Sequence, residues 1–551
     1  MRKCIFLLLV LLGSSIAQES GARYLIVAPD DLFGVIQPLA QWKNRMGLRT
    51  KIVKLSQIGY SAAAIKAYVD NAYNTWPTKP EYLLLVGAPN YIPFFYFSAG
   101  NCYSDNYYTN MDADIYNEIL SGRLNVHNPT EAQTVVNKIL LYEKTPDLED
   151  SLWFIGACLI VNEDYSTYPP PPYGDDSIYW SDIRHAKSLM LAHGYNTVDT
   201  LSDLLGNSAS TIINRVNSGR AFVLYRGSAT NVWYYPFSVD PNVTQNGSKL
   251  PIVLSITCGT LSASSSPTTS EKWAYTGSAT TPRGAAGYYA TTTSGSNISH
   301  LRSAVCKGFF NALFDEKKQT FGEACEGGRL NVYNMYSSSS EYRGFTTIGD
   351  PSMRIWTAIP KRLDVYHDST LTVDAESLRI DVLCNESPVD SALVCVLIDT
   401  TVYEYGYTEN NGQIIFRFDT LVQGNMHITV TADNKIPYLD SIPVGEIGVG
   451  EMTPAVEEIG SYVEVSPNPF TKLATVSFGI GHGAERMELN IYDASGRLVK
   501  SFYHGSGIVD RESVASWNGR DDHDRQLPAG VYFVRLTAND EVNSVPVLLV
   551  R

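Results

Sequence analysis

Two short hydrophobic runs each lead into a residue that could do chemistry. Ala221–Tyr225 leads into Arg226-Gly227, and Pro251–Thr257 leads into Cys258. Runs of this length, rich in β-branched and aromatic residues and bounded by glycine, predict buried parallel strands. Reactive groups collect at the carboxyl ends of such strands in open α/β sheets. We therefore expect Arg226 and Cys258 to lie at one edge of a sheet.

A cysteine near an arginine indicates a reactive thiol. A neighbouring cation favours the thiolate, which is the nucleophilic form of Cys258. Group transfer through a thiolate also needs an acid that protonates the leaving group, and histidine suits this task because its pKa lies near neutrality. Arginine does not, since its pKa exceeds about 12.

Other groups could join this edge. His300 lies between a predicted strand and a predicted helix, where it could supply a proton or simply cap the helix. Glu271 and Asp240 are carboxylates that could take part in catalysis or form a structural salt bridge with Arg226.

An acidic loop offers a second kind of chemistry. Asp105, Asp112 and Asp114 are closely spaced in a polar stretch that ends at Arg123. Such oxygens could bind calcium, or could cap turns and pair with the arginine, because the stretch holds no complete calcium-loop motif.

The elements that must position these residues alternate between strand and helix. Short connections between them predict mostly parallel sheets with helices on both faces. We expect one α/β unit over residues 18–145 and a second over residues 146–358. The first few elements are predicted as strands at Tyr24–Val27, Leu48–Val53 and Tyr82–Val86, and helices at Phe33–Met46 and Ala62–Ala72.

From Lys361 the sequence pattern changes to alternating apolar and polar residues. Residues 361–444 predict an immunoglobulin-like β-sandwich, residues 445–461 a linker rich in glycine and acidic residues, and residues 462–551 a second β-sandwich.

The N-terminus predicts export. Arg2 and Lys3 precede an apolar run, Ile5–Leu12, and Ser15–Ala17 supplies the small residues of a signal-peptidase site, so residues 1–17 read as a signal peptide. The run is too short to span a bilayer, and we expect no transmembrane segment in the mature chain. The formal net charge of -15 argues against nucleic acid as a partner.

Cysteine usage leaves an unpaired thiol. The part of the chain after the signal peptide has seven cysteines, an odd number, with no zinc-like spacing. We expect Cys384 and Cys395 to be candidates for a disulfide and Cys258 to be free.

Several stretches in order resemble the gingipain family of cysteine peptidases. The resemblance covers about Arg23–Thr357, and its motifs are Tyr82–Gly87 with Tyr91–Pro93, Ser104-Asp105, Asp112–Asp114, Gly122-Arg123, Lys138 with Tyr142-Glu143, Ser255–Cys258, Ser270-Glu271 and Gly349–Met353. It implies a pair of caspase-like α/β subdomains followed by an immunoglobulin-like module, and it places Cys258 at the nucleophile. It also implies an endopeptidase of protein or peptide substrates that requires no cofactor.

One position departs from the family pattern. The family carries its catalytic histidine in a Gly-His-Gly-Ser run, which here reads Tyr225-Arg226-Gly227-Ser228. The alternative to an active peptidase is therefore a silenced relative that acts as a surface binding or scaffold protein.

The terminal module resembles the sorting domain of type IX secretion substrates. The motifs are Ser466–Phe470, Ile491–Arg497, Trp517–Asp521 and Pro528–Phe533. The resemblance implies the secretion machinery as a partner and a secreted or cell-surface location; an adhesion-type sandwich is the alternative interpretation.

Overall fold

The computed structural model describes residues 21–112, 114–164 and 174–445, and within the C-terminal part 462–466, 470, 474–479, 487–493, 496–505, 512–523, 525–538 and 541–550. The chain divides into two compact units, Met1–Ile447 and Gly448–Arg551, which are described separately. The predicted signal peptide, and the predicted linker apart from its first residue, lie outside the described residues.

The first unit is built on one ten-stranded sheet with the order β2-β1-β3-β6-β12-β11-β10-β9-β7-β8. Its strands are β1 Tyr24–Ala28, β2 Thr50–Lys54, β3 Tyr82–Val86, β6 Leu120–Leu124, β7 Gly156–Val161, β8 Thr197–Ser202, β9 Phe222–Arg226, β10 Ile252–Ser255, β11 Gly287–Thr291 and β12 Phe345–Ile348. A small hairpin, β4 Phe95–Phe97 and β5 Cys102–Ser104, lies outside this sheet.

The sheet has two halves of opposite direction. Neighbouring strands are parallel except at the β11–β12 pair, where Tyr289 faces Thr347 in antiparallel register. Strands from both predicted α/β units therefore form one sheet, in which β12 of the second unit pairs in parallel with β6 of the first, and the carboxyl ends of β7, β9, β10 and β11 share one edge. The predicted fold class of mostly parallel strands with helices on both faces is confirmed.

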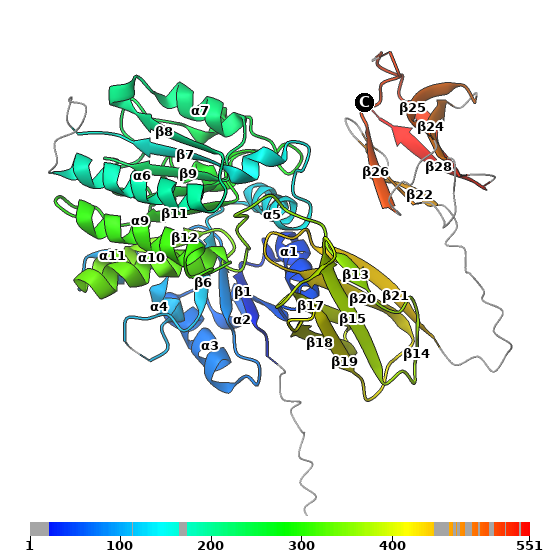
Figure 1. Cartoon of the computed structure of the whole chain (residues 1–551), viewed down its shortest axis with the longest axis horizontal. Helices are drawn as coiled ribbons and strands as arrows, with labels where there is room; N and C mark the ends of the chain where they lie inside the picture. Colours follow the sequence, from blue (N-terminus) through cyan, green and yellow to red (C-terminus); the bar gives the residue numbers. More distant parts are fainter. Residues whose placement is uncertain are drawn as a thin grey trace, which may run out of the picture. The chain divides into compact units, whose positions relative to one another are not determined.

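Helices cover both faces of this sheet. They are α1 Phe33–Arg45, α2 Leu55–Ile58, α3 Ala62–Thr75, α4 Asn106–Thr109, α5 Pro129–Lys144, α6 Asp175–Ala192, α7 Ala209–Asn217, α8 Lys272–Tyr275, α9 Ser299–Phe314, α10 Phe321–Tyr336 and α11 Ser339–Gly344, with 3-10 turns at Ser151–Ile155, Asp203–Leu205 and Pro241–Val243. One core holds α1, α5, α6, α9 and α10, and two smaller cores hold α3 and α7 on the other face. Figure 1 shows α6, α9 and α10 side by side.

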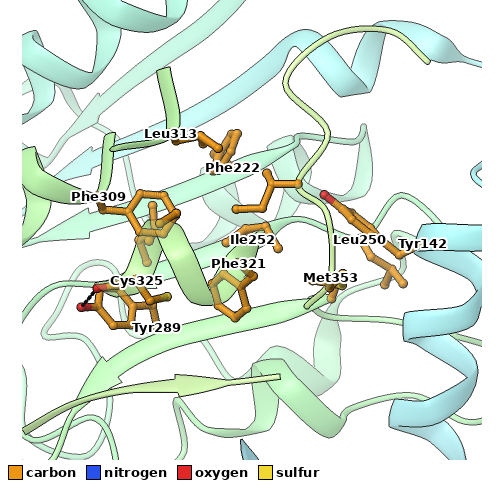
Figure 2. Packing of buried hydrophobic residues seen from close by; sticks show 14 of the residues in the cluster. Tyr142, Phe222, Leu250, Ile252, Tyr289, Phe309, Leu313, Phe321, Cys325 and Met353 are labelled. Carbon is orange, nitrogen blue, oxygen red and sulfur yellow. Dashed lines mark hydrogen bonds between the residues drawn. The ribbon is translucent and has the colours of Figure 1, made fainter. Parts of the chain in front are cut away.

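The larger core joins strand and helix side chains directly. Figure 2 shows aromatic and aliphatic residues from β9, β10, β11, α9 and α10, among them Phe222, Ile252, Tyr289, Phe309 and Phe321. The hydroxyl of Tyr289 donates to the Cys325 carbonyl over 2.9 Å, so this tyrosine satisfies its polar atom inside the core.

Local sequence signals explain several helix starts. Asn128 caps α5, its Oδ1 accepting from the amide of Glu131 over 3.0 Å, and Pro129 takes the first helical position. Thr320 and Glu323 form a capping box at the start of α10.

A buried ionic cluster ties α1 to the end of the α/β region. The Lys43 ammonium lies 2.5 Å from a Glu143 carboxylate oxygen and 2.6 Å from Asp350 Oδ2, and the Lys43 and Asp350 side chains are 0% exposed. The Tyr24 hydroxyl donates to Asp350 over 2.9 Å. These contacts explain the buried position of the Gly349–Met353 motif.

The predicted immunoglobulin-like module forms a β-sandwich in the same unit. Its strands are β13 Asp364–Tyr366, β14 Leu371–Thr372, β15 Ser377–Cys384, β16 Ser387–Pro388, β17 Leu393–Ile398, β18 Val402–Tyr407, β19 Gln413–Arg417, β20 Gly424–Thr431 and β21 Tyr438–Gly445. The sandwich contacts α1 and the residue before β2: the Tyr403 hydroxyl donates to the Asn44 carbonyl over 2.9 Å, and the Arg49 guanidinium lies 4.4 Å from the Tyr403 ring centre.

The expected Cys384–Cys395 disulfide is wrong. Both thiols are free and buried, and they belong to strands of different sheets, β15 and β17. Cys384 faces the sandwich core, whereas Cys395 lies 3.8 Å from the Asn44 carbonyl of α1, so the two side chains point to different surroundings.

The second unit is a separate β-sandwich. Its strands are β22 Tyr462–Ser466, β23 Ala474–Gly479, β24 Met487–Asp493, β25 Leu498–Gly505, β26 Glu512–Trp517, β27 Gly530–Ala538 and β28 Glu541–Leu549, in sheets β22-β23-β26 and β25-β24-β27-β28. The predicted all-β module is confirmed, with Trp517 fully buried in its core.

Candidate active site

Cys258 lies just beyond the carboxyl end of β10 and is half-buried. The Thr257 hydroxyl donates to the Gly227 carbonyl over 2.5 Å, which joins this turn to the end of β9. The six other cysteines in the described part of the chain are buried, so Cys258 is the accessible thiol among them.

The residue after the cysteine must be small. Gly259 has φ +48°, and a Cβ there would lie 2.8 Å from Ser294 Oγ and 3.1 Å from the Thr230 carbonyl oxygen. Its amide donates to the Thr293 carbonyl over 2.9 Å. This close packing holds the cysteine turn against the loop that follows β11.

The nearest cation to the sulfur is Arg302 on α9. Its Nη1 donates to Cys258 Sγ over 2.7 Å, and the Gly295 carbonyl lies 3.6 Å from the same sulfur. Nε of Arg302 donates to Glu341 over 3.3 Å, and Nη2 donates to the Thr293 carbonyl over 3.2 Å. All three guanidinium nitrogens of this buried side chain are therefore occupied.

The charge of Arg302 is secured by its surroundings. Burial by itself would lower the pKa of Arg302, but the negative charges of Glu341 and Cys258 outweigh it and raise the pKa. The Arg302 and Glu341 side chains are 4% and 3% exposed. The site therefore presents a permanently charged guanidinium to the sulfur.

Arg226 does not reach the cysteine, which corrects the expectation from its sequence position. Its side chain is 1% exposed and forms an ion pair with Asp182 of α6 over 2.8 Å. Nη1 donates to the Ile256 carbonyl over 2.5 Å and Nη2 to the Ser299 carbonyl over 3.1 Å. Arg226 is buried, and its hydrogen bonds connect β9 with the cysteine turn and the start of α9.

Glu271 also lies apart from the sulfur. Its carboxylate accepts from Asn125 over 2.6 Å and from the amides of Ser262 and Thr268 over 2.5 and 3.0 Å. Burial raises the pKa of Glu271 to about 7. This residue organises the loop that follows Cys258 and is not among the hydrogen-bond partners of the Cys258 sulfur.

His300 is exposed at the second position of α9, and its ring packs edge-on against Tyr336 with centroids 5.1 Å apart. Asp240 pairs with Lys272 over 3.0 Å and not with Arg226. In the described part of the chain, the hydrogen-bond partners of the Cys258 sulfur are Arg302 and Gly295, and no histidine is among them.

A carboxylic acid does lie on the same sheet edge. Asp164 follows β7 and accepts from the Ser228 hydroxyl over 3.2 Å, at the end of β9. Partial burial, together with the charges of Asp176 and Asp175, raises the pKa of Asp164. A carboxyl group with a raised pKa holds its proton to higher pH, so it can donate that proton.

Comparison with known proteins places this arrangement in a family. Residues 17–356 match Peptidase family C25. The chain belongs to peptidase family C25. It is 23% identical to Gingipain R2 of Porphyromonas gingivalis over 502 residues, which cover 88% of this chain and 64% of that protein. It is also 23% identical to Lys-gingipain of the same species over 463 residues, covering 77% of this chain and 26% of that protein.

Solved structures agree with this membership at the level of the fold. The crystal structure of the Arg-specific cysteine proteinase gingipain R superposes with a TM-score of 0.68 at 21% identity, over 77% of this chain and 98% of that one. The C25 chain therefore has the caspase-like fold of the gingipains. Residues 466–541 match the FlgD Ig-like domain, in keeping with the observed terminal sandwich.

In this C25 chain the acidic loop separates into two parts. Both carboxylate oxygens of Asp105 accept from the buried Arg123, over 2.5 and 2.9 Å, so Asp105 forms a salt bridge and does not join the other two aspartates. Asp112, Asp114 and Glu118 each offer an oxygen within 4.8 Å of the others. A cation could bind these three carboxylates.

Sequence reasoning missed Arg302 and Glu341. One signal was present: a cation in the first turn of a helix opposes the helix dipole and needs a compensating partner. Arg302 occupies such a position in α9, but its partner Glu341 lies 39 residues away in α11. Nothing in the sequence connects the two residues.

Within the described residues, no helix combines the length and the hydrophobicity that crossing a membrane requires.

Proposed function

We propose that this chain is an exported cysteine endopeptidase that cleaves protein substrates through Cys258. The observation that carries the proposal is the accessible Cys258 sulfur at the carboxyl end of β10, which accepts a hydrogen bond from Arg302 over 2.7 Å. Membership of family C25 supports the reaction class. The thiolate would attack the scissile carbonyl and form a thioester with the acyl part of the substrate.

The leaving amine needs a proton that neither arginine can give, because a guanidinium keeps its proton at physiological pH. We assign this task to Asp164. In support, Asp164 lies on the same sheet edge as the nucleophile, and its pKa is raised by partial burial. A substrate bound across β9 would lie between the two groups.

This assignment predicts an acid-dependent activity. A general acid works in its protonated form, which is populated below its pKa, so cleavage should slow as pH rises through the raised pKa of Asp164. The assay is hydrolysis of an unfolded protein at pH 5 and pH 8. Cys258→Ala should abolish cleavage, and Asp164→Asn should reduce it about 100-fold. Asp203→Asn, an exposed aspartate after β8, is the matched control and should retain full activity.

The second candidate is the silenced surface protein. The resemblance to the gingipain family implies a histidine where this chain has Arg226, and Arg226 is enclosed by Asp182 and two carbonyl groups. If the native chain leaves unfolded protein intact at every pH, the silenced binding protein is the correct function.

Export and sorting belong to the same proposal. Residues 1–17 would direct the chain out of the cytoplasm, and the terminal sandwich would engage the type IX secretion machinery. The match of that sandwich to an Ig-like domain supports a self-contained module. The test is expression in a host with this secretion system: the full chain should reach the medium or cell surface, and a chain ending at residue 445 should stay in the periplasm.

We further propose that Asp112, Asp114 and Glu118 bind calcium without taking part in the reaction. Three oxygen ligands at an exposed loop fit a hard cation. Calcium should raise the melting temperature of the native chain and leave that of Asp114→Asn unchanged. Equal shifts in both proteins would exclude this site.

A further inference from the structure

Arg302 is a cation at a position that disfavours positive charge. It lies in the first turn of α9, where the helix dipole disfavours positive charge, and its side chain is 4% exposed. A buried guanidinium is stable when its charge is compensated and its donors are satisfied. Glu341 supplies a negative charge, and the sulfur of Cys258 accepts a hydrogen bond from the same guanidinium.

The groups that bind the Arg302 guanidinium are also hydrogen-bonded to one another. The Thr293 hydroxyl donates to Glu341 over 2.7 Å, and Arg302 Nη2 donates to the Thr293 carbonyl over 3.2 Å. The same carbonyl accepts from the Gly259 amide over 2.9 Å. One peptide group thus fixes both the cation and the turn that carries the nucleophile.

We infer that Arg302 is the catalytic cation of this site: it holds the Cys258 sulfur as the thiolate and aims it, and Glu341 and Thr293 position Arg302. The inference rests on the proposed role of Cys258 as nucleophile. Nη1 keeps its proton throughout, so attack by the sulfur forms a carbon–sulfur bond without a proton transfer to Arg302. The proton for the leaving group comes from another group.

A local cation leaves a signature that a structural arginine would not. Iodoacetate carries a negative charge and iodoacetamide is neutral, yet both alkylate a thiolate with loss of iodide. The chain has a formal net charge of -15, so its overall field repels iodoacetate. A preference for iodoacetate over iodoacetamide must therefore arise from a positive charge close to the sulfur.

The experiment measures the alkylation rate of Cys258 in the full chain at pH 7 with each reagent. Mass spectrometry locates the label, and Cys258→Ala gives the background. We expect the iodoacetate-to-iodoacetamide rate ratio of the native protein to exceed that of a cysteine peptide about 10-fold. A ratio equal to or below that of the peptide overturns the inference without any variant.

Variants then separate charge from shape. Arg302→Met should lower the iodoacetamide rate about 10- to 100-fold, which is the range for losing a hydrogen bond to a charged group, and should reduce the rate ratio to the peptide value. Arg302→Lys keeps the charge and should retain a raised ratio. If the lysine and methionine variants give the same ratio, or if the methionine variant labels as fast as the native chain, the inference is wrong.

Arg220→Met is the matched control. Arg220 is also a buried, ion-paired arginine, bonded to Asp199 over 2.8 Å, but it lies before β9 at the opposite edge of this half-sheet. Its replacement should leave both rates unchanged. Because labelling needs no peptide cleavage, a chain that labels but does not cleave would refute the endopeptidase and leave the role of Arg302 intact. Normal cleavage by Arg302→Met would refute the role of Arg302 and leave the endopeptidase proposal intact.

Discussion

Replacing Arg226 tests whether its position is structural. In Arg226→Met the side chain keeps an unbranched apolar stem but loses the ion pair with Asp182 and two donors to carbonyl groups, at Ile256 and Ser299. A hydrogen bond to a charged group is worth about 2 kcal/mol, and each lost hydrogen bond to a buried carbonyl costs about 1 kcal/mol. The expected loss in free energy of unfolding is therefore about 4 kcal/mol, which agrees with the cost of breaking a buried ion pair.

Neutralising Asp182 should restore part of the free energy of unfolding that Arg226→Met loses. Asp182 is fully buried, and without Arg226 it retains the Ser303 hydroxyl and the Lys307 ammonium, which lies 3.5 Å away. The double variant Asp182→Asn with Arg226→Met removes the stranded charge, so its loss should be smaller than the sum of the two single losses by at least about 1 kcal/mol.

Urea denaturation followed by tryptophan fluorescence measures these losses. Arg379→Met, which removes an exposed pair with Asp381, is the control and should leave the urea midpoint unchanged. A loss below about 1 kcal/mol for Arg226→Met, or full additivity in the double variant, would refute the structural account.

Further outcomes follow from other buried groups. Lys43→Met should cost about 3–5 kcal/mol in urea denaturation, because it strands the buried carboxylates of Glu143 and Asp350 together. The pKa of Glu271 is raised by burial from 4.5 to about 7, so the folded state keeps this proton longer than the unfolded state. Its contribution to stability is complete below about pH 4.5 and is lost as pH rises through about 7, a change of about 3 kcal/mol that should be absent in Glu271→Gln.

The strands that carry the site were predictable because their composition leaves little choice. Ala221–Tyr225 and Pro251–Thr257 were predicted, and β9 Phe222–Arg226 and β10 Ile252–Ser255 were found. Both are fully buried, as hydrophobic runs between helix-covered faces must be, and the one charged residue, Arg226, is paired with Asp182. The position of Cys258 at the carboxyl edge followed from the same pattern.

The central strand β6 escaped prediction because its sequence is polar. It reads Leu-Ser-Gly-Arg-Leu, and its Arg123 is completely buried because Asp105 and the carbonyls of Gly87 and Ile92 surround the guanidinium. The glycine is required as well, since a Cβ at Gly122 would lie 2.3 Å from the Gly349 carbonyl oxygen. Because these partners are distant from β6 in the sequence, its polar residues are typical of a loop when the sequence is considered alone.

The direction of Arg226 was equally hidden. Successive strand residues face opposite sides of a sheet, so Arg226 and Tyr225 cannot share surroundings. Tyr225 packs in the smaller core with Trp233, whereas Arg226 faces α6 and forms an ion pair with Asp182. Cys258 comes after its strand has ended, and its side chain is free to face the edge. From sequence spacing alone, Arg226 and Cys258 are both expected at the carboxyl edge of the sheet.

The two arginines are connected through the backbone they hold. Arg226 binds the Ile256 carbonyl, two residues before the nucleophile, and the Ser299 carbonyl, three residues before Arg302 on α9. It therefore sets the distance between the sulfur and its cation without touching either. Arg226→Lys would keep the charge beside Asp182, but one ammonium cannot replace a planar guanidinium that spans three acceptors. We expect this variant to fold and to alkylate Cys258 with iodoacetamide about 3- to 10-fold more slowly than the native chain, since the hydrogen bond that supports the thiolate depends on geometry. Native labelling rates in a folded Arg226→Lys protein would show that the cysteine turn and α9 hold their positions without this tie.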